Sequence, residues 1–287
     1  MSGEAAAARS DPAPLRIFLS HPGVLFGGMT LAGIVLLTGI GPVFATDPVS
    51  INPLNRLKPP GAGGFFGTDM LGRDVFSRVL NGGRMSLTVG LAVAFLSVTI
   101  GLTLGLIAGY IRSLDAVIMR VMDGLMSIPA ILLAIAMIAL SGATLTTVIV
   151  AIVIPEIPRV VRLVRSVVLT VREEPYVEAA IAAGTRTFQI MRRHILPNTV
   201  APLIVQATYI CGSAMLLEAI LGFLGAGIPP EIPSWGNIMA EGRTYFQLTP
   251  WIIFFPGLAL ALAVLAVNFI GDGLRDTLDP RIARTMR

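Results

Sequence analysis

Cysteine, histidine and lysine are nearly absent from this chain, and charged residues of either sign are sparse. The single cysteine, Cys211, lies in an apolar block, which excludes a disulfide framework and a thiolate metal site. The two histidines, His21 and His194, have no neighbours at ligand spacing, so neither a metal site nor a catalytic histidine is expected. No G-x-x-x-x-G-K-[ST] phosphate loop occurs, and we therefore predict a non-catalytic chain that binds no cofactor of its own.

Apolar residues dominate what remains. Of the 287 residues, 54% are hydrophobic and only 13% are charged, and the mean hydropathy is +0.81. This composition is too apolar for a soluble domain and predicts an integral membrane protein in contact with a lipid bilayer. The net charge of +4 does not indicate a nucleic-acid partner, because the basic residues lie between apolar blocks and not in one run interleaved with aromatics.

Long stretches with few charges predict an all-α fold with six transmembrane helices, since a span needs about 20 mostly apolar residues. The predicted spans are residues 24–45, 85–110, about 117–140, 143–164, 199–224 and 251–271. They divide the chain into an N-terminal tail (1–23), a first span (24–45), a loop (46–84), a core (85–271) and a C-terminal tail (272–287). The polar lead before the first span favours an uncleaved signal anchor over a cleavable signal peptide.

Charged and small residues inside the predicted spans indicate ion pairs within a helix and close packing between helices. Two charged pairs at i,i+3 spacing are each expected to neutralise themselves on one helix face: Arg120 with Asp123 in the third span, and Glu156 with Arg159 in the fourth. Small residues recur at four-residue spacing in the second span and predict close packing against another helix: Gly101, Gly105 and Gly109.

The distribution of basic residues predicts which side of the membrane each segment faces. Basic residues concentrate in the tails and between the fourth and fifth spans, which places these segments on the cytoplasmic side. Both termini are therefore expected in the cytoplasm, and the loop 46–84 outside. That loop runs against the rule, because it carries five basic residues: Arg56, Lys58, Arg73, Arg78 and Arg84.

The cytoplasmic segment 165–198 is polar and rich in small residues. Glu173-Glu174-Pro175 predicts the start of a short helix, with acidic residues and proline in its first turn. The apolar positions of that helix form one stripe: Tyr176, Val177, Ala180 and Ile181. A turn at Gly184 and a second short helix over 188–195, ended by Pro197, complete the segment. From the residues alone, the stripe fits a membrane surface as well as it fits a partner protein.

This segment resembles the EAA loop of ATP-binding-cassette (ABC) importer permeases. The match consists of Glu178-Ala179-Ala180, Gly184 and Leu196-Pro197, and His194 gives the His-Ile-Leu-Pro-Asn form of the dipeptide, oligopeptide and nickel group. Three further segments are similar to the same group, and together they extend the resemblance over nearly the whole chain: 67–87, 221–237 and 271–280. The chain looks like the second, C-type permease subunit of such a system.

The resemblance implies the type I ABC importer permease fold, with cytoplasmic coupling helices that dock on an ATPase. It assigns that contact to Glu178, Ala179, Ala180, Gly184, His194, Leu196 and Pro197. The implied partners are a second homologous permease, two ABC ATPase subunits that bind ATP and Mg, and a solute-binding protein, at the bacterial cytoplasmic (inner) membrane. The implied cargo is a peptide, with nickel or opine-type cargo as the alternative. An ion-coupled secondary transporter is the rival, and the lack of an evident internal repeat argues against it.

Four charged residues outside the coupling segment are candidates for the pathway or its outer gate. Glu218 is an ionisable group in the fifth span, which either lines the pathway or pairs with a hydrogen-bond donor near the outer surface. Asp69, Arg73 and Asp74 either close the outer gate or meet the solute-binding protein, or they form a helix cap with local ion pairs. Pro155-Glu156-Ile157-Pro158 departs from the family pattern and leaves the helix geometry of the fourth span open.

Overall fold

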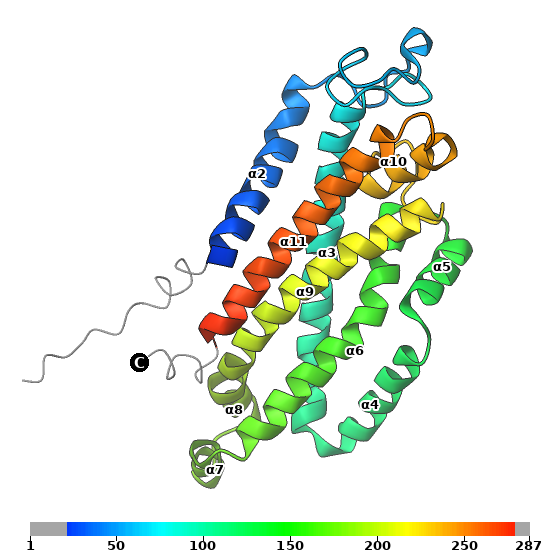
Figure 1. Cartoon of the computed structure of the whole chain (residues 1–287). Helices are drawn as coiled ribbons and strands as arrows, with labels where there is room; N and C mark the ends of the chain where they lie inside the picture. Colours follow the sequence, from blue (N-terminus) through cyan, green and yellow to red (C-terminus); the bar gives the residue numbers. More distant parts are fainter. Residues whose placement is uncertain (1–21, 279–287) are drawn as a thin grey trace, which may run out of the picture.

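The computed structural model describes residues 22–278, and in that range helices make up most of the chain, with one long loop over 45–74 (Figure 1). The longer helices are α2 (Pro22–Phe44), α3 (Val75–Tyr110), α4 (Arg112–Met126), α5 (Ala130–Ser141), α6 (Leu145–Arg172), α9 (Leu196–Phe223) and α11 (Trp251–Leu278). The short ones are α7 (Pro175–Ala182), α8 (Thr187–Ile190) and α10 (Trp235–Gly242), with 3-10 turns at Pro53–Asn55 and Arg243–Tyr245 and a π turn at Met191–Ile195. The predicted all-α class is confirmed for these residues. The predicted tail 1–23 lies almost entirely outside the described residues, as does the end of the tail 272–287.

The helices form one bundle with a distinct structure at each end. α3 packs against α6 and α9, and α11 packs against α9 and α2. Figure 1 shows the loop before α3 together with α10 at the upper end of the bundle, and α7 and α8 at the lower end. We use "upper" and "lower" in this sense below. The predicted orientation makes the lower end cytoplasmic.

Several helices have the length and composition of membrane spans. Four are long and apolar enough to cross a membrane, and the bent α4–α5 pair raises the number to five. α6 has 28 residues but carries charges near its middle, so its assignment as the fourth of six spans stays a prediction. Large apolar side chains are exposed on the outside of the bundle, as hydrocarbon contact requires: Leu36, Phe95, Leu132 and Leu140 are examples.

α3 begins at Val75, not at Met85 as the uncharged stretch predicted. Asp74 caps the helix, because its carboxylate accepts a hydrogen bond from the backbone N–H of Ser77 at 3.0 Å. The 36 residues of α3 span about 54 Å, which exceeds the roughly 30 Å of a hydrocarbon core. The upper turns of α3 can therefore stand outside the membrane, so the charge of Arg78 does not have to meet lipid.

The third predicted span is broken into two helices. α4 and α5 meet at an angle of 85°. Pro129 explains the break, because proline lacks an N–H and disfavours a helical conformation in the residue before it. The predicted pairing of Arg120 with Asp123 is wrong, since Asp123 accepts a hydrogen bond from Arg162 of α6 at 2.6 Å.

α6 is continuous from Leu145 to Arg172, through both of its prolines. The predicted pair within it is confirmed, with Arg159 Nη1 3.0 Å from Glu156 Oε1. The predicted close packing of the second span is confirmed as well. Each of the three glycines faces a valine of α6, and a Cβ on Gly101 would come within 2.4 Å of Val160. Glycine is therefore what lets α3 and α6 approach closely.

Candidate functional site

α7 begins where the sequence predicted. Glu174 is its N-cap residue, and Pro175 follows at a position where the missing N–H has no helical partner in any case. Glu178 lies in the first turn, where the helix dipole favours a negative charge, and its side chain is exposed. Val177 is fully buried and fixes the helix to the lower end of the bundle.

Gly184 provides the predicted turn after α7. Its φ of +75° lies in the left-handed region. Its N–H donates to the carbonyl of Ile181 at 2.9 Å, and the Thr185 N–H donates to Ala180 at 3.1 Å, which together form a Schellman motif. A Cβ at this position would meet nothing within 4 Å. The backbone conformation, and not lack of space, therefore requires glycine here.

Pro197 does not end the second short helix, in contrast to the prediction. α8 leads through the π turn Met191–Ile195 into α9, and Leu196 and Pro197 are the first residues of α9. In a regular α-helix the ring of Pro197 would clash with the carbonyl four residues earlier, and the wider π turn relieves this contact. α8 is thus continuous with a membrane helix, and a displacement of one must move the other.

Residues 175–197, from α7 to the start of α9, form a projection at the lower end of the bundle, which we call the lower projection. The predicted coupling residues are divided between its surface and its interior. Glu178, Ala179, Gly184 and Pro197 are exposed, whereas Ala180, His194 and Leu196 are half-buried. His194 lies beside Tyr176, with 5.8 Å between ring centroids. The Asn198 amide donates to the His194 carbonyl at 2.6 Å. The ring contact joins α7 to the π turn that leads into α9, so His194 supports the shape of the projection.

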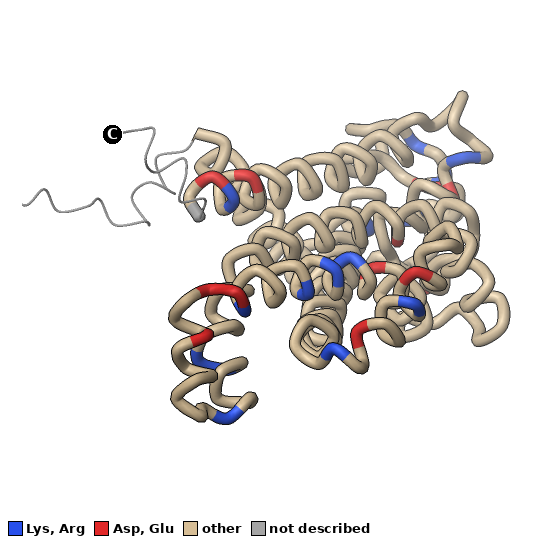
Figure 2. The backbone as a smooth tube through the Cα atoms, turned by 90° about the horizontal axis from the view of Figure 1, so that it is seen from below, with Lys and Arg blue, Asp and Glu red and all other residues tan. Residues whose placement is uncertain are grey.

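The surface of this lower projection is both apolar and charged. Phe188 is 74% exposed, although Ile190 and Ile195 of the same segment are buried. In Figure 2, which is seen from below, acidic and basic residues lie close together in the projection at the lower left. An exposed large aromatic with charges around it is typical of a protein interface.

A buried cluster of four charged residues joins the upper loop to α10. Asp69 Oδ2 accepts from Arg73 Nε at 2.6 Å and from Arg78 Nη1 at 2.8 Å. Both arginines also donate to Glu241, with Arg78 Nη2 at 3.0 Å from Oε1. Asp69 and Arg78 are each 1% exposed. The predicted local ion pair of Asp69 with Arg73 is present, but no sequence pattern predicted Glu241, which is 163 residues from Arg78.

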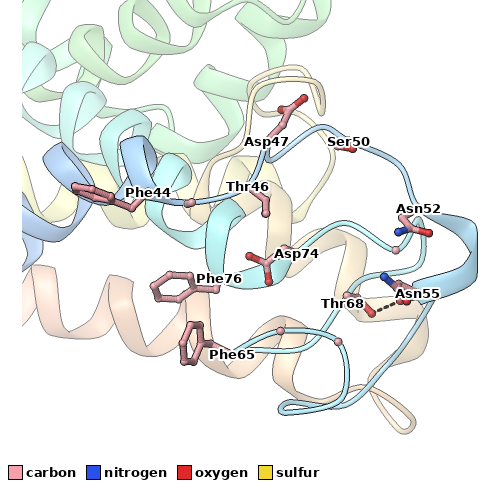
Figure 3. A pocket seen from close by; sticks show the side chains of 14 residues that line it. Phe44, Thr46, Asp47, Ser50, Asn52, Asn55, Phe65, Thr68, Asp74 and Phe76 are labelled. Atoms are coloured by element: carbon pink, nitrogen blue, oxygen red, sulfur yellow. Dashed lines mark hydrogen bonds between the residues drawn. The ribbon is translucent and has the colours of Figure 1, made fainter.

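A cavity of about 410 Å³ opens beside this cluster at the upper end (Figure 3). The side chains of Phe65, Phe76 and Asp74 lie around it, and Thr68 hydrogen-bonds the backbone of Asn55 on its wall. Two rings near the cavity, those of Phe65 and Phe76, have centroids 5.5 Å apart. Aromatic rings from the loop and from the first turn of α3 thus lie at this cavity.

Glu218 is buried in α9 and does not face open space. Ser86 Oγ of α3 donates to Glu218 Oε2 at 2.9 Å, and Ser86 Oγ in turn accepts from the backbone N–H of Trp235 at 3.3 Å. Glu218 is 0% exposed. Of the two predicted alternatives, the geometry matches pairing with a hydrogen-bond donor, which here connects α3, α9 and α10.

Comparison with known proteins identifies the family. Residues 101–284 match the family described as the binding-protein-dependent transport system inner membrane component. This chain belongs to that family. It is accordingly a multi-pass inner-membrane permease of the ABC transporter class.

Alignments with similar permeases extend over nearly the full chain. The "probable peptide ABC transporter permease protein y4tQ" of Sinorhizobium fredii is 54% identical over 270 residues, which cover 94% of this chain and 93% of the relative. The dipeptide transport system permease protein DppC of Alkalihalophilus pseudofirmus is 44% identical over 260 residues, covering 90% and 86%. The resemblance drawn from the EAA loop is confirmed.

The fold of this permease is also similar to a solved structure. A chain of the MetNI methionine ABC transporter, in an inward facing conformation, aligns with a TM-score of 0.55 and 23% identity. The alignment covers 73% of this chain and 96% of that chain. The predicted importer permease fold is confirmed. Within residues 22–278, no group of three or more His, Cys, Asp or Glu side chains is placed to hold a metal ion.

Proposed function

We propose that this permease imports peptides, forming half of a translocation pathway with a second homologous permease. The named relatives that cover most of the chain are peptide or dipeptide permeases, which supports peptide over nickel or opine-type cargo. Two ABC ATPase subunits bind ATP and Mg and perform the hydrolysis, and a solute-binding protein delivers the cargo. The permease itself is non-catalytic, binds no cofactor or nucleic acid, and has both termini in the cytoplasm.

The lower projection is the ATPase contact in this proposal. The single observation that carries it is the continuity of the projection with the bundle. α6 ends at Arg172, directly before α7, and α8 runs into α9 without interruption. An ATPase that moves the projection therefore moves α6 and α9 together, and these two helices pack against each other.

The seven coupling residues have different parts in this contact. Glu178, Ala179, Gly184 and Pro197 form the exposed surface that meets the ATPase, and Phe188 adds an apolar side chain to it. Ala180, His194 and Leu196 are half-buried and hold that surface in shape.

The charged residues at the upper end are structural in this proposal. Asp74 caps α3, and Asp69 and Arg73 fasten the loop to α10. The solute-binding protein would meet the apolar side chains that this loop exposes. Leu54 and Phe65, which are 88% and 81% exposed, stand on a part of the chain that is not expected to contact lipid.

Gly184→Val, with Gly225→Val as a matched control, tests the coupling role. Gly225 has a φ of +81°, an open Cβ position and the same Schellman hydrogen bonds, but it lies at the upper end of α9. A β-branched residue is strongly disfavoured in the left-handed region, so both substitutions disturb an equivalent turn. The tagged permease is purified from native membranes, and the proteins retained with it are identified by mass spectrometry.

We expect the unchanged permease to retain a second permease and ABC ATPases, and only Gly184→Val to lose the ATPases. Equal ATPase retention by both variants would contradict the coupling role. A permease that purifies alone, with no ABC component, would overturn the proposed function as a whole.

A further inference from the structure

A polar recess lies near mid-height of the bundle, between α6, α9 and α11. The polar side chains that line it are Glu156, Arg159, Gln206, Tyr209, Ser213 and Asn268. These positions fall near the middle of three helices of 28 residues each. Such a helix is about 42 Å long and crosses a hydrocarbon core of roughly 30 Å. The recess is therefore close to the midplane of the membrane.

The ion pair in this recess presents its positive member outward. Arg159 Nη1 donates to both carboxylate oxygens of Glu156, at 3.0 and 3.1 Å. The Arg159 side chain is 55% exposed, whereas that of Glu156 is 7% exposed. Among the residues described, Nε and Nη2 of Arg159 have no hydrogen-bond partner. Glu156 thus orients the guanidinium from the buried side, and Nε and Nη2 remain available to a ligand on the exposed side.

Lipid is not a plausible neighbour for this surface. A charged side chain that faces hydrocarbon at this depth is strongly disfavoured, so intramembrane arginines face protein or a water-filled cavity. In the same helix, Pro155 and Pro158 cannot donate the N–H that would pair the carbonyl four residues earlier. Irregular hydrogen bonding at membrane depth is tolerated where the backbone lines a cavity or is covered by protein. Of the segment 155–158, which departs from the family pattern, Glu156 lines the recess.

We propose that this recess contacts the cargo, and that Arg159 binds the carboxylate of a peptide in transit while Glu156 positions its guanidinium. This inference rests on the proposed function, which supplies peptides as cargo and a second permease to close the pathway. Every linear peptide with a free C-terminus carries a carboxylate, and the planar guanidinium donates to carboxylates in pairs of hydrogen bonds. The amides of Gln206 and Asn268 are available to the peptide backbone from the other two helices.

Thiol labelling tests whether the recess is wet and attracts anions. Ser213→Cys is introduced into the complete transporter together with Cys211→Ala, so that the new thiol is the only one in this chain. The rates of an anionic sulfonatoethyl and a cationic trimethylammonioethyl methanethiosulfonate are compared, with and without Arg159→Gln. In water, a unit positive charge about 6 Å from the thiol raises the reaction rate of the anionic reagent about threefold and lowers that of the cationic reagent about threefold. Loss of Arg159 should therefore lower the ratio of the anionic to the cationic rate about tenfold.

The labelling has two outcomes that would overturn the proposal. One is a ratio that does not change with Arg159→Gln. The other is a thiol that reacts with neither reagent, both without nucleotide and after vanadate trapping, because the recess is then sealed by protein.

Uptake of a labelled dipeptide into proteoliposomes, measured per ATP hydrolysed, tests cargo contact. We expect Arg159→Gln to lower this ratio at least tenfold and Arg159→Lys to lower it less, since lysine keeps the charge but not the paired donors. Arg162→Gln is the matched control, because Arg162 lies on the same helix in an exposed pair with Asp123 and should behave as the unchanged protein.

The results separate this inference from the proposed function. Unchanged uptake in Arg159→Gln, or loss of the second permease from that variant on purification, would refute cargo contact; the latter would make the pair a subunit interface. If the unchanged transporter imports no peptide, the proposed function fails, while the labelling ratio still decides whether the recess is an anion-attracting part of the pathway.

Discussion

The buried charge cluster at the upper end makes the sharpest prediction about stability. Asp69→Asn removes one carboxylate from the cluster but keeps the local turn, because Oδ1 can still accept from the backbone N–H groups of Leu71 and Arg73. The new amide group then faces the donors of Arg73 and Arg78, with only Glu241 left to balance two positive charges. Breaking a buried ion pair by removing one partner costs about 3–5 kcal/mol.

An exposed pair provides the comparison. Asp123 and Arg162 are 59% and 45% exposed, and such a pair contributes about 0–1 kcal/mol. Asp123→Asn should therefore leave the melting temperature nearly unchanged. The loss of about 3–5 kcal/mol in Asp69→Asn should lower it by roughly 6–20 °C.

Tryptophan fluorescence of the purified protein in detergent can follow this transition. The chain has two tryptophans, and both donate hydrogen bonds near the cluster: Trp235 to Val79 at 3.0 Å and Trp251 to Thr68 at 3.3 Å. Asp69→Asn with Arg78→Met leaves Arg73 paired with Glu241, so the double variant should be less destabilised than the sum of the single ones. If Asp69→Asn melts within about 2 °C of Asp123→Asn, the cluster does not stabilise the upper end of the bundle as its burial indicates.

Three further predictions concern other parts of the bundle. Gly101→Ala should destabilise the protein by about 1–3 kcal/mol, because its Cβ overlaps α6, whereas Gly33→Ala in open space should not; thermal unfolding measures both. Phe188→Ser should weaken ATPase binding roughly tenfold with no change in melting temperature, as titration of purified ATPase would show; unchanged affinity would remove Phe188 from the interface. Glu218→Gln should fold normally, since its amide oxygen can accept from Ser86, and Glu218→Leu should lose about 1–3 kcal/mol; equal melting of the two would mean that this hydrogen bond is unimportant.

The local structure of α7 and of the turn after it could be predicted from the sequence. Pro175 can only be accommodated early in a helix, and Gly184 is the residue that adopts a left-handed turn without strain. The glycines of α3 likewise predicted a close helix contact, because four-residue spacing places them on one face. In each case the deciding interaction lies within a few residues along the chain or repeats with the helix period.

The predictions were wrong where the structure at a residue depends on its wider context and not on the residue type or spacing alone. Pro197 has the appearance of a helix end, yet the π turn before it allows the helix to continue. Asp123 has a basic residue at i,i+3 spacing but pairs with Arg162 on another helix, because α4 and α6 are in contact. Pro129 bends the third span by 85°, although composition made that span look continuous.

The membrane class and the permease family could be inferred from the sequence alone, because they depend on hydropathy and on residues at fixed spacing. Which charged residues form pairs depends on how the helices pack. The tertiary structure joined Glu241 to Arg78 across the chain, buried Glu218 against Ser86, and left Arg159 exposed at mid-height of α6. Charge pairs form between residues that packing brings within a few ångströms, and sequence spacing reports that distance only along a single helix.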